Sequence, residues 1–414
     1  MKTAIISFNK EAELKNKLED LAIFGANPAF SEKLHVGRPN QGNFQHLIER
    51  IDDIFKRRWF TNNGVYVQEL EHKIATMVGA KHCIAMCNGT LALEIAIRAA
   101  GLTGEVIVPS FTFIATAHAL QWQGITPIFC DIDPKTHNID PRRLKEIITS
   151  YTTGIIGVHT WGRPCDVDAL VDFSQRHHLK LLFDAAHAFA SSYRGKMIGQ
   201  FGDAEIFSFH ATKFFNTFEG GAVATNNDAM AAKMRLMNNF GFQGYDRVIS
   251  VGTNGRMNEI SAAMGLTSFE SIDDYIKVNH RNYLQYRSEL DEIPGIRLID
   301  YDEKEKCNYQ YIVCEIDENI TKIIRDQLIE ILHAENILAR RYFFPGCHKM
   351  EPYRSLFPDA GRHLSCTERL VKKVLALPTG MAIGQDEIHK ICWILRLAVE
   401  NGPELCRRMK LTKK

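Results

Sequence analysis

LLFDAAHAFASSYRGKMIGQFGDAEIFSFHATKFFNTFEGGAVATNN, residues 181–227, indicates the fold class more clearly than any other part of the chain. Its apolar runs LLFDAA, AEIFSF and GAVATN are short and lie between turns rich in glycine and polar residues, which is typical of buried strands. Similar runs lie upstream (HCIAM, EVIVP, TPIFCDI and TGIIGVH), separated by stretches with helical periodicity such as LALEIAIRAAG and VDALVDFSQRHH. This alternation, from about residue 82 to 226, predicts an α/β fold with a central, mostly parallel sheet covered by helices.

The character of the sequence changes near residue 250. NEISAAMGLTSFESIDDYIKVNHRNYLQYRSELDEI predicts a long helix or a broken pair of helices. Strand-like pieces follow (IRLID, NYQYIVCEI and ILARRYFF), with helices expected near 322–335, 365–374 and 385–400. A chain of 414 residues is long for a single core. We therefore expect a large α/β domain over residues 1–250, including the N-terminal segment, and a smaller α+β domain over residues 251–414.

Composition and charge exclude several classes of protein. Lys and Arg total 50 against 49 for Asp and Glu, so no overall charge favours nucleic acid or an anionic membrane. The ten cysteines are scattered, and the closest pair, Cys83 and Cys87, lacks the spacing of a zinc site. The N-terminal apolar run is too short for a signal peptide, and no apolar run is long enough to span a membrane. We expect a cytoplasmic protein with reduced thiols and no metal site.

Two residues of the opening stretch carry reactive chemistry. Asp184 closes one predicted strand, and Lys213 follows the end of another, in SFHATK. Pyridoxal 5'-phosphate (PLP) requires both types of residue, because a lysine amine forms the Schiff base and a carboxylate keeps the pyridine nitrogen protonated. Alone, such a lysine is usually a solvated charge and such an aspartate usually caps a turn. Their order on one alternating fold favours the PLP site.

Further candidates lie where predicted strands end. Gly89 and Thr90 open a helix in CNGTLALEIAIRAAG, which makes either a plain N-cap or an anion site for the cofactor phosphate. Phe113 is either a core residue or an aromatic that stacks on the pyridine ring. Ser208 offers a hydroxyl suited to a phosphate. His187, in AAHA, is either an interior histidine or part of the site.

Six motifs carry a resemblance to a known family: FDAAHA, GDAEIFSFHATK, EGGAV, WFTNNGVYVQELE, NGRMNEISAAMG and LPTGMAIGQDEI. They resemble the DegT/StrS-type family of sugar aminotransferases, which are fold type I PLP enzymes. The resemblance covers nearly the whole chain. It implies that Lys213 forms the Schiff base, that Asp184 pairs with the pyridinium and that His187 stands near the ring hydroxyl, where many relatives have Gln. It also implies that phosphate contacts come from Gly89, Thr90 and Ser208, and that Phe113 stacks on the ring.

The resemblance further implies a homodimer, because Asn254 matches an asparagine that reaches the phosphate of the neighbouring subunit's cofactor. Relatives with His in place of the lysine dehydrate sugars, so Lys213 favours transamination. GVHTWGRPCDVDAL is similar to members that aminate C4 of dTDP-4-keto-6-deoxyglucose with L-glutamate, as in O-antigen lipopolysaccharide biosynthesis. Candidate contacts to the nucleotide-sugar substrate are His210, Tyr342, His348, Arg38 and Arg256, each of which has an ordinary packing or ion-pair role as its alternative.

Several other functions remain open at this point. A dTDP-3-keto sugar C3 aminotransferase and a UDP-sugar 4-aminotransferase share these motifs. A regulatory protein that keeps the fold without catalysis has no need of a reactive lysine. A nicotinamide dehydrogenase is disfavoured because no G-x-G-x-x-G follows a predicted strand.

Overall fold

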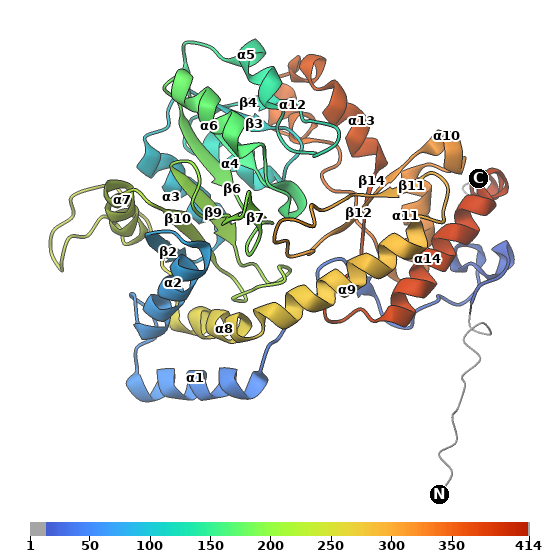
Figure 1. Cartoon of the computed structure of the whole chain (residues 1–414), viewed down its shortest axis with the longest axis horizontal. Coiled ribbons are helices and arrows are strands. Elements are labelled where there is room, and N and C mark those ends of the chain that lie inside the picture. Colours follow the sequence, from blue (N-terminus) through green and yellow to red (C-terminus); the bar gives the residue numbers. More distant parts are fainter. Residues whose placement is uncertain (1–13, 413–414) are drawn as a thin grey trace, which may run out of the picture.

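The computed structural model describes residues 14–412 and contains a seven-stranded sheet in the order β2-β10-β9-β6-β5-β3-β4 (Figure 1). The N-terminal apolar run that we expect to be too short for a signal peptide lies outside the described residues. Each of the seven apolar runs forms one strand, and only β10 is antiparallel to its neighbours, so the predicted α/β fold is confirmed. The strands are β2 (His82–Met86), β3 (Glu105–Pro109), β4 (Thr126–Cys130), β5 (Thr152–Val158), β6 (Lys180–Asp184), β9 (Ala204–Ser208) and β10 (Gly221–Thr225).

Helices cover both faces of this sheet (Figure 1). Alternate strand residues point to opposite faces, so Ile84 and Met86 pack in one apolar cluster while Cys83 and Ala85 pack in another. On the first face lie α3 (Gly89–Ala100), α4 (Ile114–Gln121) and α7 (Asp228–Asn238). On the second lie α2 (Val65–Val78), α6 (Val167–Arg176) and α8 (Glu259–Glu270).

The C-terminal part is built on a three-stranded antiparallel sheet of β11 (Ile296–Leu298), β12 (Ile312–Ile316) and β14 (Val374–Leu377). The long helical stretch is a broken pair, because α8 ends at Glu270 and α9 (Ile272–Leu290) starts anew. The three further predicted helices are present as α11 (Arg325–Ala334), α13 (Ser365–Lys373) and α14 (Gln385–Glu400), and α15 (Gly402–Thr412) follows them. Of ILARRYFF, only β13 (Ile337–Leu338) is a strand.

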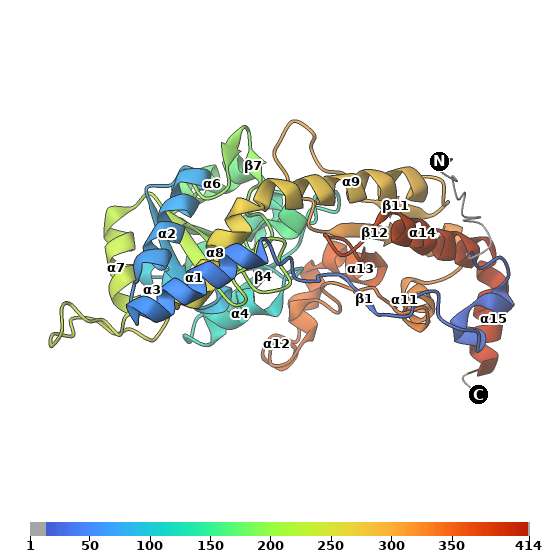
Figure 2. The same cartoon turned by 90° about the horizontal axis from the view of Figure 1, so that it is seen from below.

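The N-terminal segment lies against C-terminal elements (Figure 2). Its strand β1 (Leu34–His35) pairs with β13, and Leu18 and Leu21 belong to the apolar cluster of the C-terminal part. Conversely, α8 packs on α2 and on α1 (Phe44–Arg57) of the large part. These contacts do not follow the expected domain boundary at residue 250, because the N-terminal segment packs with the C-terminal part and α8 packs with the large part. We therefore propose that residues 14–38 and 272–412 form the smaller domain.

None of the helices within residues 14–412 combines the length and apolar character needed to cross a membrane.

Candidate active site

A cavity of about 410 Å³ opens where β6 and β9 end and α3 begins. Ligands bind at the carboxyl ends of parallel strands in folds of this type, because loops and helix N-termini meet there. The cavity gathers these predicted residues: Gly89, Thr90, Phe113, Asp184, His187, Ser208, His210, Lys213 and Tyr342. The smaller domain also contributes Tyr311, Arg340 and Phe343, so the cavity lies between the two parts of the chain.

Lys213 lies in the turn after β9, and its Nζ donates a hydrogen bond to the Tyr311 hydroxyl at 3.1 Å. Desolvation lowers the pKa of Lys213 from 10.5 to about 8, although Tyr342 and Asp184 oppose the shift. A lysine with this pKa is substantially neutral near pH 8, and only a neutral amine is a nucleophile. The turn is held by Asn40, whose Nδ2 donates to Phe214 O at 2.9 Å.

Asp184 is 5% exposed and lies at the end of β6. Its Oδ2 accepts a hydrogen bond from Thr116 Oγ1 at 2.8 Å, and its Oδ1 accepts one from the Ala186 N–H at 3.1 Å. Burial raises the pKa of Asp184, and the Thr116 hydrogen bond opposes that shift. No ion pair to Asp184 is found among residues 14–412. A buried carboxylate without a cationic partner suits the protonated ring nitrogen of PLP.

His187 lies between aromatic rings in the wall of the cavity. Its ring is tilted against Tyr311 at a centroid distance of 4.4 Å and stacks on Trp161 at 6.0 Å. Burial, with a smaller contribution from Lys213, lowers the pKa of His187 well below its usual value. The imidazole is therefore neutral at physiological pH.

The N-terminus of α3 lines one end of the cavity. Asn88 caps the helix, with its Oδ1 accepting from the Leu91 N–H at 2.8 Å. A Cβ on Gly89 would lie 2.9 Å from the Cβ of Ser208, so only glycine lets the helix start approach β9 this closely. The first turn and the Ser208 hydroxyl together suit a phosphate.

The mouth of the cavity is aromatic and partly basic. Phe113 is 58% exposed there, and Arg340 lies over the ring of Tyr342 at 5.4 Å. His210 contacts Thr212 Oγ1 at 2.8 Å and Glu219 at 3.3 Å.

Four predicted residues do not line this cavity. His348 is 4% exposed, and its ring is held between Ser110 Oγ at 2.7 Å and Glu368 at 2.9 Å, because the loop after β13 turns it inward. Asn254 accepts a hydrogen bond from Arg256 Nε at 3.1 Å, and Arg256 also donates to Asn239 at 2.7 Å, so both belong to a polar cluster outside the cavity.

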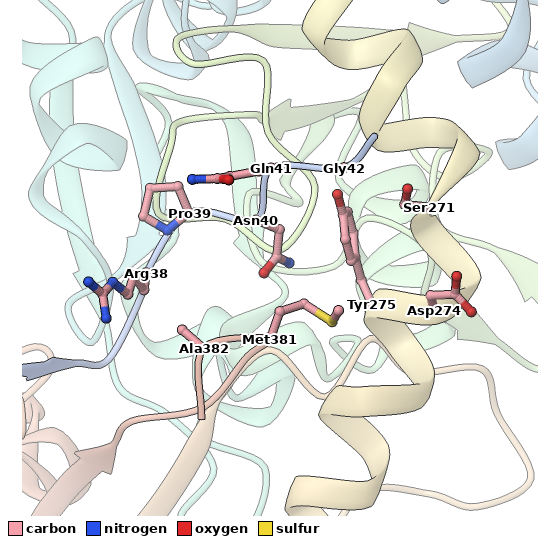
Figure 3. A pocket seen from close by; sticks show the side chains of 10 residues that line it. All are labelled: Arg38, Pro39, Asn40, Gln41, Gly42, Ser271, Asp274, Tyr275, Met381 and Ala382. Atoms are coloured by element: carbon pink, nitrogen blue, oxygen red, sulfur yellow. The ribbon is translucent and has the colours of Figure 1, made fainter. Parts of the chain in front are cut away.

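Arg38, the remaining one, lines a separate hollow of about 560 Å³ between the N-terminal segment and α9 (Figure 3). Its guanidinium lies 3.6 Å from Glu32, across the hollow from Tyr275 and Asp274. Its neighbour Gly37 packs against Thr212, which lines the cavity.

The structure adds residues that the sequence patterns did not single out, chiefly Tyr311, Arg340 and Thr116. Tyr311 is 98 positions from Lys213 along the chain, and no local motif signals their contact. Thr116 follows Phe113 by one helical turn, which is the available hint that it lies at the same site.

This arrangement defines a PLP-dependent enzyme of the aminotransferase class. The DegT/DnrJ/EryC1/StrS aminotransferase family model matches residues 43–396, and the chain belongs to that family. The dTDP-4-amino-4,6-dideoxy-D-glucose transaminase of Shigella dysenteriae is 36% identical over 363 residues, covering 88% of this chain and 98% of that protein. The GDP-perosamine synthase of Caulobacter vibrioides is 36% identical over 343 residues, covering 80% and 90%.

A solved structure, DesI in the presence of its TDP-sugar product, aligns with a TM-score of 0.91 and 47% identity. The alignment covers 95% of this chain and 100% of that chain. The resemblance noted from the motifs is therefore confirmed, as are the fold, the PLP cofactor and the activity class of nucleotide-sugar transamination.

Proposed function

We propose that the enzyme transfers the amino group of L-glutamate to C4 of dTDP-4-keto-6-deoxy-D-glucose, which gives dTDP-4-amino-4,6-dideoxy-D-glucose and 2-oxoglutarate. The observation that carries the chemistry is the desolvated Lys213 amine beside the unpaired Asp184 carboxylate in one cavity. Two dTDP-4-amino-4,6-dideoxy-D-glucose transaminases, 36% and 33% identical to the chain, support this sugar. The similarity to DesI supports a dTDP-linked product.

We assign the roles of the residues on the basis of their positions in the cavity. PLP, when bound, supplies an electron sink for the carbon that exchanges its amine. Lys213 would hold the cofactor covalently, and its amine, once released, would act as general base and acid for the proton on the carbon that exchanges its amine. Asp184 would keep the ring nitrogen protonated, while the α3 N-terminus and Ser208 would hold the phosphate.

The nucleotide sugar enters through the aromatic mouth. Arg340 lines the cavity, whereas the predicted candidates Arg38 and Arg256 do not. No ion pair to Arg340 is found in residues 14–412. A planar guanidinium suits a diphosphate, so we assign that contact to Arg340. His210 and Tyr342 are assigned to the sugar.

The active enzyme is proposed to be a homodimer in the cytoplasm that serves O-antigen or a related glycan. Exposed apolar side chains lie on the loop that precedes Asn254, where Tyr245 is 97% and Val251 70% exposed, and on α1, where Phe44 is 67% exposed. The loop projects from the body of the chain (Figure 2). Such surfaces are typical of subunit interfaces, and a second copy would bring Asn254 to the partner's cofactor.

The decisive experiment incubates purified enzyme, L-glutamate and one keto sugar at a time, with the position of the new amine read by NMR. The sugars are dTDP-4-keto-6-deoxyglucose, a dTDP-3-keto-6-deoxyhexose, a UDP-4-keto sugar and a GDP-4-keto sugar. Amination at C4 of the first sugar with the highest kcat/KM supports the proposal, and preference for another sugar replaces it with the matching alternative. Lys213→Ala should abolish turnover, whereas Lys81→Ala, which removes a surface lysine paired with Asp228, should not. If none of the four sugars is aminated, the result favours a regulatory role.

A further inference from the structure

His187 is held in one tautomer by the neighbouring loop. The backbone N–H of Trp161 donates to His187 Nδ1 at 3.2 Å, so Nδ1 must carry a lone pair. In a neutral imidazole the proton is then on Nε2. Within residues 14–412 this Nε2–H has no protein acceptor, and His187 lines the cavity.

The loop that donates this bond is anchored through the indole of Trp161. The indole N–H donates to His137 Nδ1 at 3.1 Å, and His137 Nε2 lies 3.0 Å from Glu315 Oε1. The same reasoning places a proton on His137 Nε2, which donates to the Glu315 carboxylate. Glu315 lies on β12, so the series starts in the smaller domain and ends at the cavity.

Packing fixes the same residue from other sides. Trp161 is fully buried, its ring is nearly parallel to that of Phe343 at 5.3 Å, and its carbonyl accepts from the Tyr301 hydroxyl at 3.2 Å. Its backbone adopts φ 65° and ψ 12°, a left-handed conformation that a bulky residue rarely holds without support from its surroundings. The anchors thus maintain the strained geometry that aims the Trp161 N–H at His187.

We infer that Trp161 is a positioning residue that fixes His187 as an Nε2–H donor toward the cavity, supported by His137 and Glu315. The acceptor has the chemistry of an anionic ring oxygen, such as the phenolate of the cofactor. This inference rests on the proposed placement of His187 beside that oxygen. In the opposite tautomer, the Nε2 lone pair would face the anionic oxygen and repel it. The hydrogen bond from the Trp161 N–H therefore decides whether His187 attracts or repels that oxygen.

The tautomer can be measured without the cofactor. ¹⁵N-histidine-labelled apoprotein should show His187 as the Nε2–H form near pH 7.5, with the signal assigned by its loss in His187→Gln. An Nδ1–H form in the wild type would overturn the inference. Because this measurement uses only the wild-type fold, it stands even where a Trp161 variant folds poorly.

A double-mutant cycle then tests how Trp161 acts. In the cofactor-loaded enzyme, Trp161→Phe removes the indole donor but keeps an aromatic ring, and Glu315→Gln is a milder change at the far end of the series. Either change should raise the pH midpoint of the cofactor's visible absorption. We expect a rise in proton affinity of up to about tenfold, because these changes misalign the His187 bond and do not remove its donor. In a His187→Gln background the same changes should leave the midpoint unmoved, because an amide donor has no tautomer.

The matched control is Trp393→Phe, which removes an indole bond to Lys15 O far from the cavity and should not move the midpoint. Equal shifts in the wild-type and His187→Gln backgrounds would show a general structural effect and contradict the inference. Failure of the proposed function would give a different result. His187 would show the Nε2–H form and the cofactor spectrum would be as expected, but the dTDP sugar would not be aminated.

Discussion

Thr116→Val tests how Asp184 is kept ionised. The substitution preserves the shape of a fully buried side chain but removes the hydroxyl that donates to Asp184 Oδ2 at 2.8 Å. It also leaves Thr112 Oγ1, 2.9 Å from the lost hydroxyl, without that partner. The pKa of Asp184, already raised by burial, should rise further because one donor to the carboxylate is lost.

The magnitude follows from a buried hydrogen bond to a charged group, about 1.5–3 kcal/mol, which corresponds to roughly 10- to 150-fold. The proposed pairing with the ring nitrogen requires the ionised carboxylate. With a raised pKa, Asp184 loses its ionised form at a higher pH than in the wild type. The affinity of Thr116→Val for PLP should therefore be up to roughly 10- to 150-fold weaker at low pH and approach that of the wild type at high pH.

The assay is titration of apoenzyme with PLP across a pH series, with bound cofactor followed by its visible absorption. Thr116→Ser keeps the hydroxyl and is the matched control, which should behave like wild type. A uniform loss of affinity at every pH, or equal losses for Val and Ser, would refute the reasoning.

Four shorter predictions concern the Lys213 turn, the buried His348, the phosphate site and the Lys213 amine. Asn216→Ala removes the amide that donates to Asn40 O at 2.9 Å and should destabilise the Lys213 turn by about 1–3 kcal/mol, read as a lower Tm and slower cofactor reloading. His348→Ala should lower Tm through lost buried bonds of about 2 kcal/mol while leaving KM for the sugar unchanged; a raised KM with normal Tm would return His348 to the substrate site. Gly89→Ala should weaken PLP retention on dialysis because its Cβ meets Ser208, and normal retention would remove Gly89 from the phosphate site. The rate at which apoenzyme captures PLP should rise with pH through about 8, where the Lys213 amine becomes neutral, and a midpoint near 10.5 would contradict the desolvated lysine.

The sheet was predictable because each of its strands is a short apolar run with its own turn signals, as expected for strands that are buried on both faces. The smaller domain was less so. ILARRYFF has strand-like composition, yet only Ile337 and Leu338 form a strand, and their partner is the N-terminal strand β1 about 300 residues earlier. No local pattern reveals such a pairing.

The candidate site shows the same limit. Asp184, Ser208 and Lys213 converge because they lie at or just after the carboxyl ends of strands in one sheet, which sequence order is enough to predict. Tyr311 and Arg340 reach the cavity only through the packing of the smaller domain, and His348 is turned away from it by Ser110 and Glu368. These outcomes depend on tertiary contacts that motif spacing does not encode.

Borohydride reduction of the PLP-loaded enzyme, followed by peptide mapping, tests whether Lys213 holds the cofactor. We predict one modified peptide, with the cofactor on Lys213, and none in Lys213→Ala. A cofactor fixed to any other lysine would contradict this assignment.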